Sequence, residues 1–150
     1  MIQRIQTVYL FVVAILMLAT TFLPVMEVVD SNGLSSHKLD LLSLGAYSFF
    51  PAFVSPVLSL LAGIMAIFAV FLYKKRQLQM TFCSWILALT IVLYATIFYS
   101  YITVSGKDEN TTYVPELAFL FPLLTIILAC MAIAGIRKDQ KIVSSLDRLR

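Results

Sequence analysis

Long apolar runs without charged residues alternate with short polar segments along this chain. Four runs that lack Asp, Glu, Lys, Arg and His cover residues 5–23, 52–73, 80–102 and 117–136, and the last has a helical start near Pro115. At about 1.5 Å per residue, such runs cover about 28–35 Å, close to the roughly 30 Å hydrocarbon core of a bilayer. The pattern predicts four spanning helices, over residues 5–23, 52–73, 80–102 and 115–136.

Two other interpretations of the apolar runs are weaker. Strands of a membrane β-barrel alternate polar and apolar residues over about 10 positions, and these runs do not. The first run could instead be a cleaved signal peptide with Arg4 as its charged region, but the small residues expected at a cleavage site are poorly placed around residues 19–21.

The connecting segments predict small additional elements. Asn32-Gly33 lies between partly alternating runs within residues 24–51, which is typical of a β-hairpin or an irregular lid. Residues 103–114 are predicted to form a turn, and Pro115 and Glu116 suit the first turn of the fourth helix. Residues 137–150 carry apolar side chains on one helical face and basic ones on the other, so they predict an amphipathic helix at the membrane interface.

Together these elements predict the fold class and the domains. We expect an all-α membrane protein: an antiparallel four-helix transmembrane bundle with a small outer β-hairpin or lid between the first two helices, and a C-terminal amphipathic interfacial helix. The transmembrane domain comprises residues 1–136, and the cytoplasmic basic tail residues 137–150.

Composition excludes several classes of protein. Hydrophobic residues make up 61% of the 150 residues and charged residues 13%, and the mean hydropathy is +0.94. Soluble domains use about 45–50% apolar residues, so an ordinary water-soluble enzyme is excluded. Disorder needs low hydrophobicity and collagen needs periodic glycine, and neither fits a chain with 5 glycines.

Charge sets the orientation of the predicted bundle. Nine of the eleven basic residues lie before the first helix, between the second and third, or after the fourth, whereas six of the eight acids lie in the other two connections. One side therefore carries a formal charge of +7 and the other −4, out of a total of +3. By the positive-inside rule both termini are cytoplasmic, and the basic side faces anionic lipid rather than nucleic acid.

Catalytic chemistry has little support in the residues. Cys83 and Cys130 belong to different helices and form no C-x-x-C motif, so buried reduced thiols are favoured over a thiol or quinone enzyme. His37 is the single histidine, and a metal or haem site needs more ligands. Glu116 is predicted to be a helix-start residue, and the alternative is that it contacts a substrate or an ion. We predict no catalytic, cofactor-binding or metal-binding residue and no cofactor.

Small residues predict close helix packing. Ser55, Ser59 and Gly63 repeat every four residues in the second helix, where another backbone can approach. Pro122 is expected to kink the fourth helix. The remaining candidate packing residues, all in the fourth helix, are Ala129, Ala132 and Gly135.

Three segments resemble a known family. They are residues 1–10, 73–79 and 136–150, all on the predicted cytoplasmic side. On these segments the chain resembles, over its whole length, an uncharacterised family of four-pass inner-membrane proteins of Bacteroidota, a domain of unknown function. The resemblance implies topology and location in the bacterial inner membrane, and it supplies no catalytic residue.

These observations favour a non-catalytic integral inner-membrane subunit or accessory protein. It is expected to contact membrane lipid and to associate with other membrane proteins or with itself, and to bind no nucleic acid. The alternatives are an oligomeric small-molecule or lipid transporter that uses the small-residue stripe and Pro122, and, less favoured, the thiol or quinone enzyme. The predicted residues that dock partner proteins and anionic lipid are Arg4, Lys74, Lys75, Arg76, Gln77, Gln79, Arg137, Lys138, Lys141, Arg148 and Arg150.

Overall fold

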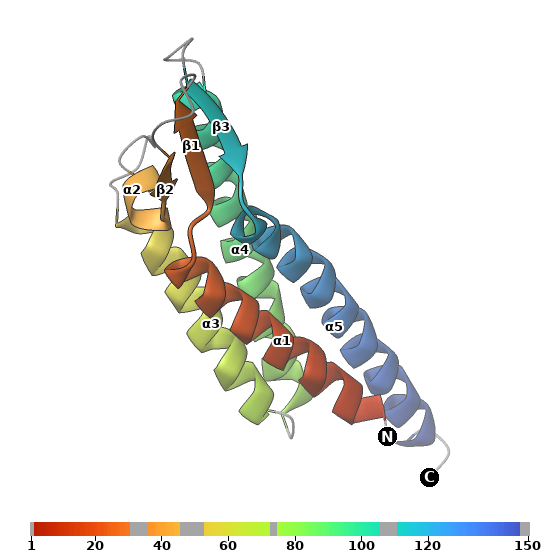
Figure 1. The fold of residues 1–150 in the computed structure, drawn as a ribbon. Helices are drawn as coiled ribbons and strands as arrows, with labels where there is room; N and C mark the ends of the chain where they lie inside the picture. Colours follow the sequence, from red (N-terminus) through yellow and green to blue (C-terminus); the bar gives the residue numbers. More distant parts are fainter. Residues whose placement is uncertain (1, 31–35, 46–52, 73–74, 106–110, 148–150) are drawn as a thin grey trace.

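A computed structural model describes residues 2–30, 36–45, 53–72, 75–105 and 111–147 (Figure 1). Within these ranges the chain is mostly helical and contains a small three-stranded sheet. The predicted predominance of helices is confirmed. In chain order the elements are α1 (Ile2–Phe22), β1 (Met26–Asp30), β2 (Ser36–Leu39), α2 (Leu41–Gly45), α3 (Val54–Phe71), α4 (Arg76–Ser105), β3 (Thr111–Pro115) and α5 (Leu117–Asp147).

The four long helices pack side by side around a common core. α1 and α4 each pack on both α3 and α5, so the helix order around the group is α1, α3, α4, α5. Successive helices run in opposite directions, which brings the start of α1 and the end of α5 to the same end (Figure 1). The sheet and the short helix α2 lie at the other end (Figure 1). We call the end with the start of α1 and the end of α5 the basic end, because Arg137 and Lys138 of α5 lie there, and the other end the sheet end.

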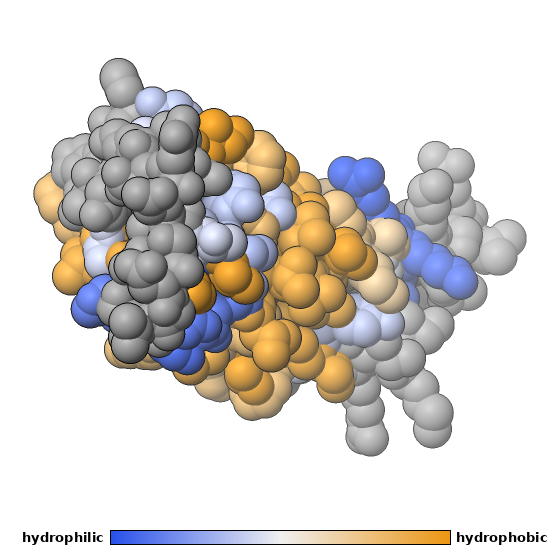
Figure 2. Space-filling model, turned by 45° about the horizontal axis from the view of Figure 1, so that its top comes forward, coloured by the Kyte–Doolittle hydropathy of each residue, from blue (hydrophilic) through white to orange (hydrophobic). Residues whose placement is uncertain are grey.

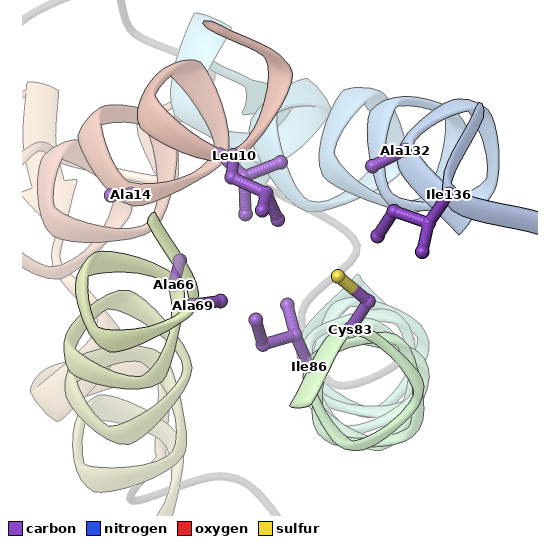
Figure 3. Packing of buried hydrophobic residues seen from close by; sticks show 9 residues of the cluster. Leu10, Ala14, Ala66, Ala69, Cys83, Ile86, Ala132 and Ile136 are labelled. Carbon is purple, nitrogen blue, oxygen red and sulfur yellow. The ribbon is translucent and has the colours of Figure 1, made fainter. Parts of the chain in front are cut away.

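Two clusters of buried side chains form the core. The cluster nearer the basic end includes Leu10 from α1, Ala66 from α3, Cys83 and Ile86 from α4, and Ile136 from α5, and Figure 3 shows these side chains converging from the four helices. The second cluster joins the bundle to the elements at the sheet end. It contains Met17, Val25, Met26, Leu41, Leu44, Ala62, Leu93, Ile97 and Ala118.

The outer faces of the long helices are also apolar. Large exposed hydrophobic side chains include Phe11 on α1, Phe68 on α3, Trp85 on α4 and Ile127 on α5. Figure 2 shows such residues across the middle of one face, with hydrophilic residues toward both ends. A helix that is apolar on both its core and outer faces is typical of a membrane span.

Three helical segments are long and apolar enough to cross a membrane: Val54–Phe71, Gln77–Thr103 and Leu117–Gln140. The apolar part of α1, Thr7–Phe22, is shorter. The chain therefore has the segments of a membrane protein in at least three of the four predicted places.

The predicted hairpin is present, and the sheet has one more strand than expected. β1 pairs antiparallel with β2, from Met26 opposite Leu39 to Val29 opposite Ser36, while the predicted Asn32-Gly33 turn lies outside the described residues. β3 pairs antiparallel with the other edge of β1, giving the order β2-β1-β3. The prediction of a turn over residues 103–114 was wrong at residues 111–114, which form a strand because they pair with β1, about 85 positions earlier in the chain.

The start of the last helix also differs from the prediction. Pro115 is the last residue of β3 and pairs with Met26. The backbone N–H of Glu116 donates to the carbonyl of Val25 at 3.0 Å, and the N–H of Phe119 donates to the carbonyl of Glu116. Strand pairing thus holds Pro115 in extended backbone, and α5 begins two residues later, at Leu117.

α5 then continues without interruption to Asp147, through Pro122. The predicted boundary between residues 136 and 137 is therefore not a helix end, and residues 137–147 continue the last long helix instead of beginning a new one. Strong helix formers such as Lys and Gln follow Ile136 with no Gly or Pro up to residue 147, so nothing in the sequence stops the helix there.

Candidate functional site

The predicted docking residues gather at the basic end. Lys75, just before α4, and Gln77, in its first turn, are exposed, as are Arg137 and Lys138 on α5. Arg4, Arg76 and Lys141 belong to α1, α4 and α5, but their side chains are not among those described. The other three predicted docking residues, Lys74, Arg148 and Arg150, lie outside the described residues.

Gln79 does not belong to this exposed surface. Its exposed fraction is 3%, so its side chain is buried and not on the surface where it was predicted to lie. Gln79 precedes Cys83 by one helical turn, and Cys83 and Ile86 face the core (Figure 3). Residues 79, 83 and 86 are separated by four and then three positions, so they lie on one face of α4. The buried face of α4 therefore begins in the first turn of the helix.

Asp139 is buried at the same end, with an exposed fraction of 9%. It lies three residues after Ile136, whose side chain lies near that of Cys83 (Figure 3). Because α4 and α5 are antiparallel and rise about 1.5 Å per residue, Gln79 and Asp139 lie at nearly the same height. We call this pair the buried polar layer. In the sequence, the burial of Asp139 is indicated because it continues, at steps of three or four residues, the apolar residues of one helix face, Ala129, Ala132 and Ile136.

The small-residue stripe of α3 packs against α1. Ser55, Ser59 and Gly63 are all buried. The Ser59 hydroxyl donates to the carbonyl of Met17 at 2.8 Å and accepts a hydrogen bond from Thr21 Oγ1 at 3.0 Å. The Ser59 hydroxyl and the small residues beside it therefore join two helices within one chain.

Gly63 allows a close approach between α1 and α3. A Cβ added at this glycine would lie 3.3 Å from both Cγ and Cδ2 of Leu18. On α5, Ala129 and Ala132 are buried and Gly135 is half-buried. The packing residues predicted in α3 and α5 therefore lie mainly on core faces.

Most other buried hydroxyls of the bundle bond to their own helix. Thr20 donates to the carbonyl of Leu16 and Thr90 to that of Ile86, each at 2.7 Å. Thr125 is a buried hydroxyl without a hydrogen-bond partner among the described residues. Bonds from a hydroxyl to the preceding turn satisfy the polar group inside an apolar environment and leave little of it for a ligand.

An ion pair ties the sheet to the last helix. Lys38 Nζ on β2 lies 2.8 Å from Glu116 Oε1 at the start of α5. The hydrogen bond and charge of Glu116 raise the pKa of Lys38 above its usual value of 10.5. Glu116 thus makes a structural contact just before α5 begins.

The two cysteines have different environments. Cys83 is buried and Cys130 is exposed, and neither is in a disulfide. Among the described residues, no group of three His, Cys, Asp or Glu side chains could hold a metal ion. The thiol alternative therefore gains no paired site from the arrangement of these two residues.

Comparison with known proteins identifies a family. The model of a family described as "Domain of unknown function (DUF4293)" matches residues 2–149. The chain belongs to this family. No curated protein and no solved structure matches it. The expectation of a family of unknown function is confirmed, and DUF4293 membership covers α1 to α5 together with the sheet.

Proposed function

We propose that this DUF4293 protein is a four-pass, non-catalytic accessory protein or subunit of the bacterial inner membrane. Its basic end faces the cytoplasm, where it docks partner proteins and contacts anionic lipid. The resemblance to four-pass inner-membrane proteins of Bacteroidota supports the location. The observation that carries the proposal is the exposure of Lys75, Arg137 and Lys138 at one end of a bundle whose outer faces are apolar.

The outer face of α1 supports a fourth membrane crossing. Val8, Phe11, Ile15 and Phe22 are exposed by 51–76%, as expected for side chains that contact lipid. The apolar segment Thr7–Phe22 has 16 residues, and it rises about 24 Å. A helix shorter than the hydrocarbon core is accommodated by local thinning of the bilayer at modest cost.

Charge supports the orientation. At the basic end the described cations Lys75, Arg137 and Lys138 outnumber the described acid Asp139, whereas at the sheet end Glu27, Asp40 and Glu116 outnumber the described cation Lys38. Cytoplasmic loops carry an excess of Lys and Arg. The proposed orientation therefore places the sheet outside the cytoplasm and both ends of the helical chain inside it.

Affinity capture from native membranes tests the docking role. A tagged protein is extracted gently, and copurifying proteins are identified by mass spectrometry. Reversing charge with Arg137→Glu and Lys138→Glu should remove a stoichiometric partner, because both side chains are exposed at the proposed docking surface. A matched double variant, Lys38→Glu with Lys107→Glu, changes the net charge equally and should retain that partner.

Two results would contradict the docking role. One is an identical set of copurifying proteins for the wild type and both double variants. The other is wild-type protein that is extracted alone in each of several mild detergents. Thermal unfolding of each variant serves as the folding control.

A further inference from the structure

The described cations of the basic end come from two distant parts of the chain and lie at nearly the same height along the helices. The N–H of Gln79 donates to the carbonyl of Lys75 at 3.0 Å, so Lys75 lies one turn beyond Gln79. Arg137 and Lys138 immediately precede Asp139 on α5. Since Gln79 and Asp139 form the buried polar layer, Lys75, Arg137 and Lys138 lie within about one turn of that layer.

The charges at this height are separated by depth. Asp139 has an exposed fraction of 9%, whereas Lys75, Arg137 and Lys138 are exposed. The acid is therefore turned into the bundle and the three cations outward. Among the described side chains near this height, the charged ones that face the surroundings are all positive.

The outer surfaces next to these cations are apolar. On α4, Leu78 and Trp85 are exposed by 46% and 60%, and on α5, Ile127 and Met131 are exposed by 51% and 46%. An acidic protein surface complements the cations but not the apolar residues beside them. A phospholipid complements both, since its charged head group meets the cations while its acyl chains lie along the helices.

We infer that the basic end selectively binds a phospholipid with an anionic head group, held by Lys75, Arg137 and Lys138 beside the apolar faces of α4 and α5. This inference rests on the proposed placement in the membrane. It goes beyond a general attraction to the membrane surface, because it predicts a preference for anionic over zwitterionic lipid at named residues.

Lipid titration of the purified full-length protein tests this inference. Native mass spectrometry, with phosphatidylglycerol and phosphatidylcholine added in turn, reports lipid bound to the protein in detergent. The wild type should retain phosphatidylglycerol at least about tenfold more strongly than phosphatidylcholine, since each cation near an anionic head group contributes appreciably. The preference should weaken as ionic strength rises.

Matched variants locate the site. Arg137→Gln with Lys138→Gln should abolish most of the preference, while Lys38→Gln with Lys107→Gln, which removes the same charge, should leave it unchanged. Equal retention of both lipids by the wild type overturns the inference, as does an unchanged preference in the Arg137 and Lys138 variant. The salt dependence of lipid binding is measured on the wild type, so it is a second test that does not depend on any substitution.

The outcome is separable from that of the proposed function. If the lipid preference is absent but partner capture still depends on Arg137 and Lys138, the cations serve a protein and only the lipid inference fails. If the preference is present but the basic end faces out of the cytoplasm, the proposed orientation fails and the lipid site stands.

Discussion

Single side chains explain how closely the helices approach. Gly63 has no side chain, and Leu18 of α1 fills the space beside it, so that a Cβ at residue 63 would lie 3.3 Å from Leu18 Cγ. The neighbouring Ser59 hydroxyl bonds to the α1 backbone at Met17. In a membrane, where lipid is as apolar as the helices, van der Waals contact and hydrogen bonds of this kind drive helix association.

Replacing Gly63 with leucine should separate α1 from α3. The larger side chain has no space beside Leu18, and overpacking of this kind costs about 1–3 kcal/mol. Val57→Leu on the exposed face of α3 is the matched control and should change stability little, since Val57 is 53% exposed. Unfolding of the purified variants in mixed detergent measures both effects, and equal stability of the two variants would contradict the packing.

The Lys38 side chain should titrate at unusually high pH. Its pKa is raised above 10.5 by Glu116, so the charge of Lys38 is fully present below pH 10.5 and is lost as the pH rises through the elevated value. The contribution to stability is small, because Lys38 is largely exposed to solvent. NMR of reductively methylated lysine should follow this titration directly. Glu116→Gln should lower the Lys38 pKa, and no change in that variant would argue against the ion pair.

At the scale of elements, the long helices were predictable and the sheet only in part. Uninterrupted apolar runs require helices in a membrane, so the four long helices fall where those runs lie. β3 was not predictable as a strand, because a short segment such as Thr111–Pro115 becomes one through pairing with Met26–Asp30. Propensity within a few residues contains no information about so distant a partner.

The candidate site shows the same division. Exposed cations at Lys75, Arg137 and Lys138 agree with the charge pattern of the sequence. The burial of Gln79 and Asp139 was missed because both polar residues lie at helix ends, where exposure is the ordinary expectation. Gln79 lies four residues before Cys83, and Asp139 lies three residues after Ile136. Each is therefore on the core face of its helix and is covered when the helices pack.

The packing of α2 against the long helices should depend on one face of this short helix. Leu44 is 1% exposed and belongs to the core cluster with Met17 and Leu93, whereas Leu42 is 58% exposed. Leu44→Ala should destabilise the protein by about 2–5 kcal/mol, and Leu42→Ala should have little effect. Thermal unfolding, together with the rate of proteolysis near α2, compares the two variants. Similar losses in both would indicate that α2 does not pack on the bundle.

At the scale of the whole molecule, an apolar surface surrounds an apolar core, and polar groups occupy the two ends. α5 has 31 residues, and it rises about 46 Å, compared with a hydrocarbon core of about 30 Å. If Leu117 lies at one edge of that core, the helix passes the other edge near residues 136–137. The cations Arg137 and Lys138 then lie at the level of lipid head groups, as the proposed function requires.

Sidedness of single cysteines tests most directly the membrane crossing by α1, whose apolar segment is the shortest of the four. In a background in which Cys83 and Cys130 are replaced by alanine, one cysteine is introduced at a time by Gln3→Cys, His37→Cys or Lys138→Cys. A membrane-impermeant maleimide is applied to right-side-out spheroplasts and to inside-out vesicles. The account predicts labelling of His37→Cys in spheroplasts, and of Gln3→Cys and Lys138→Cys in inside-out vesicles. Labelling of Gln3→Cys together with His37→Cys in spheroplasts would show that α1 does not cross the membrane and would contradict the four-pass arrangement.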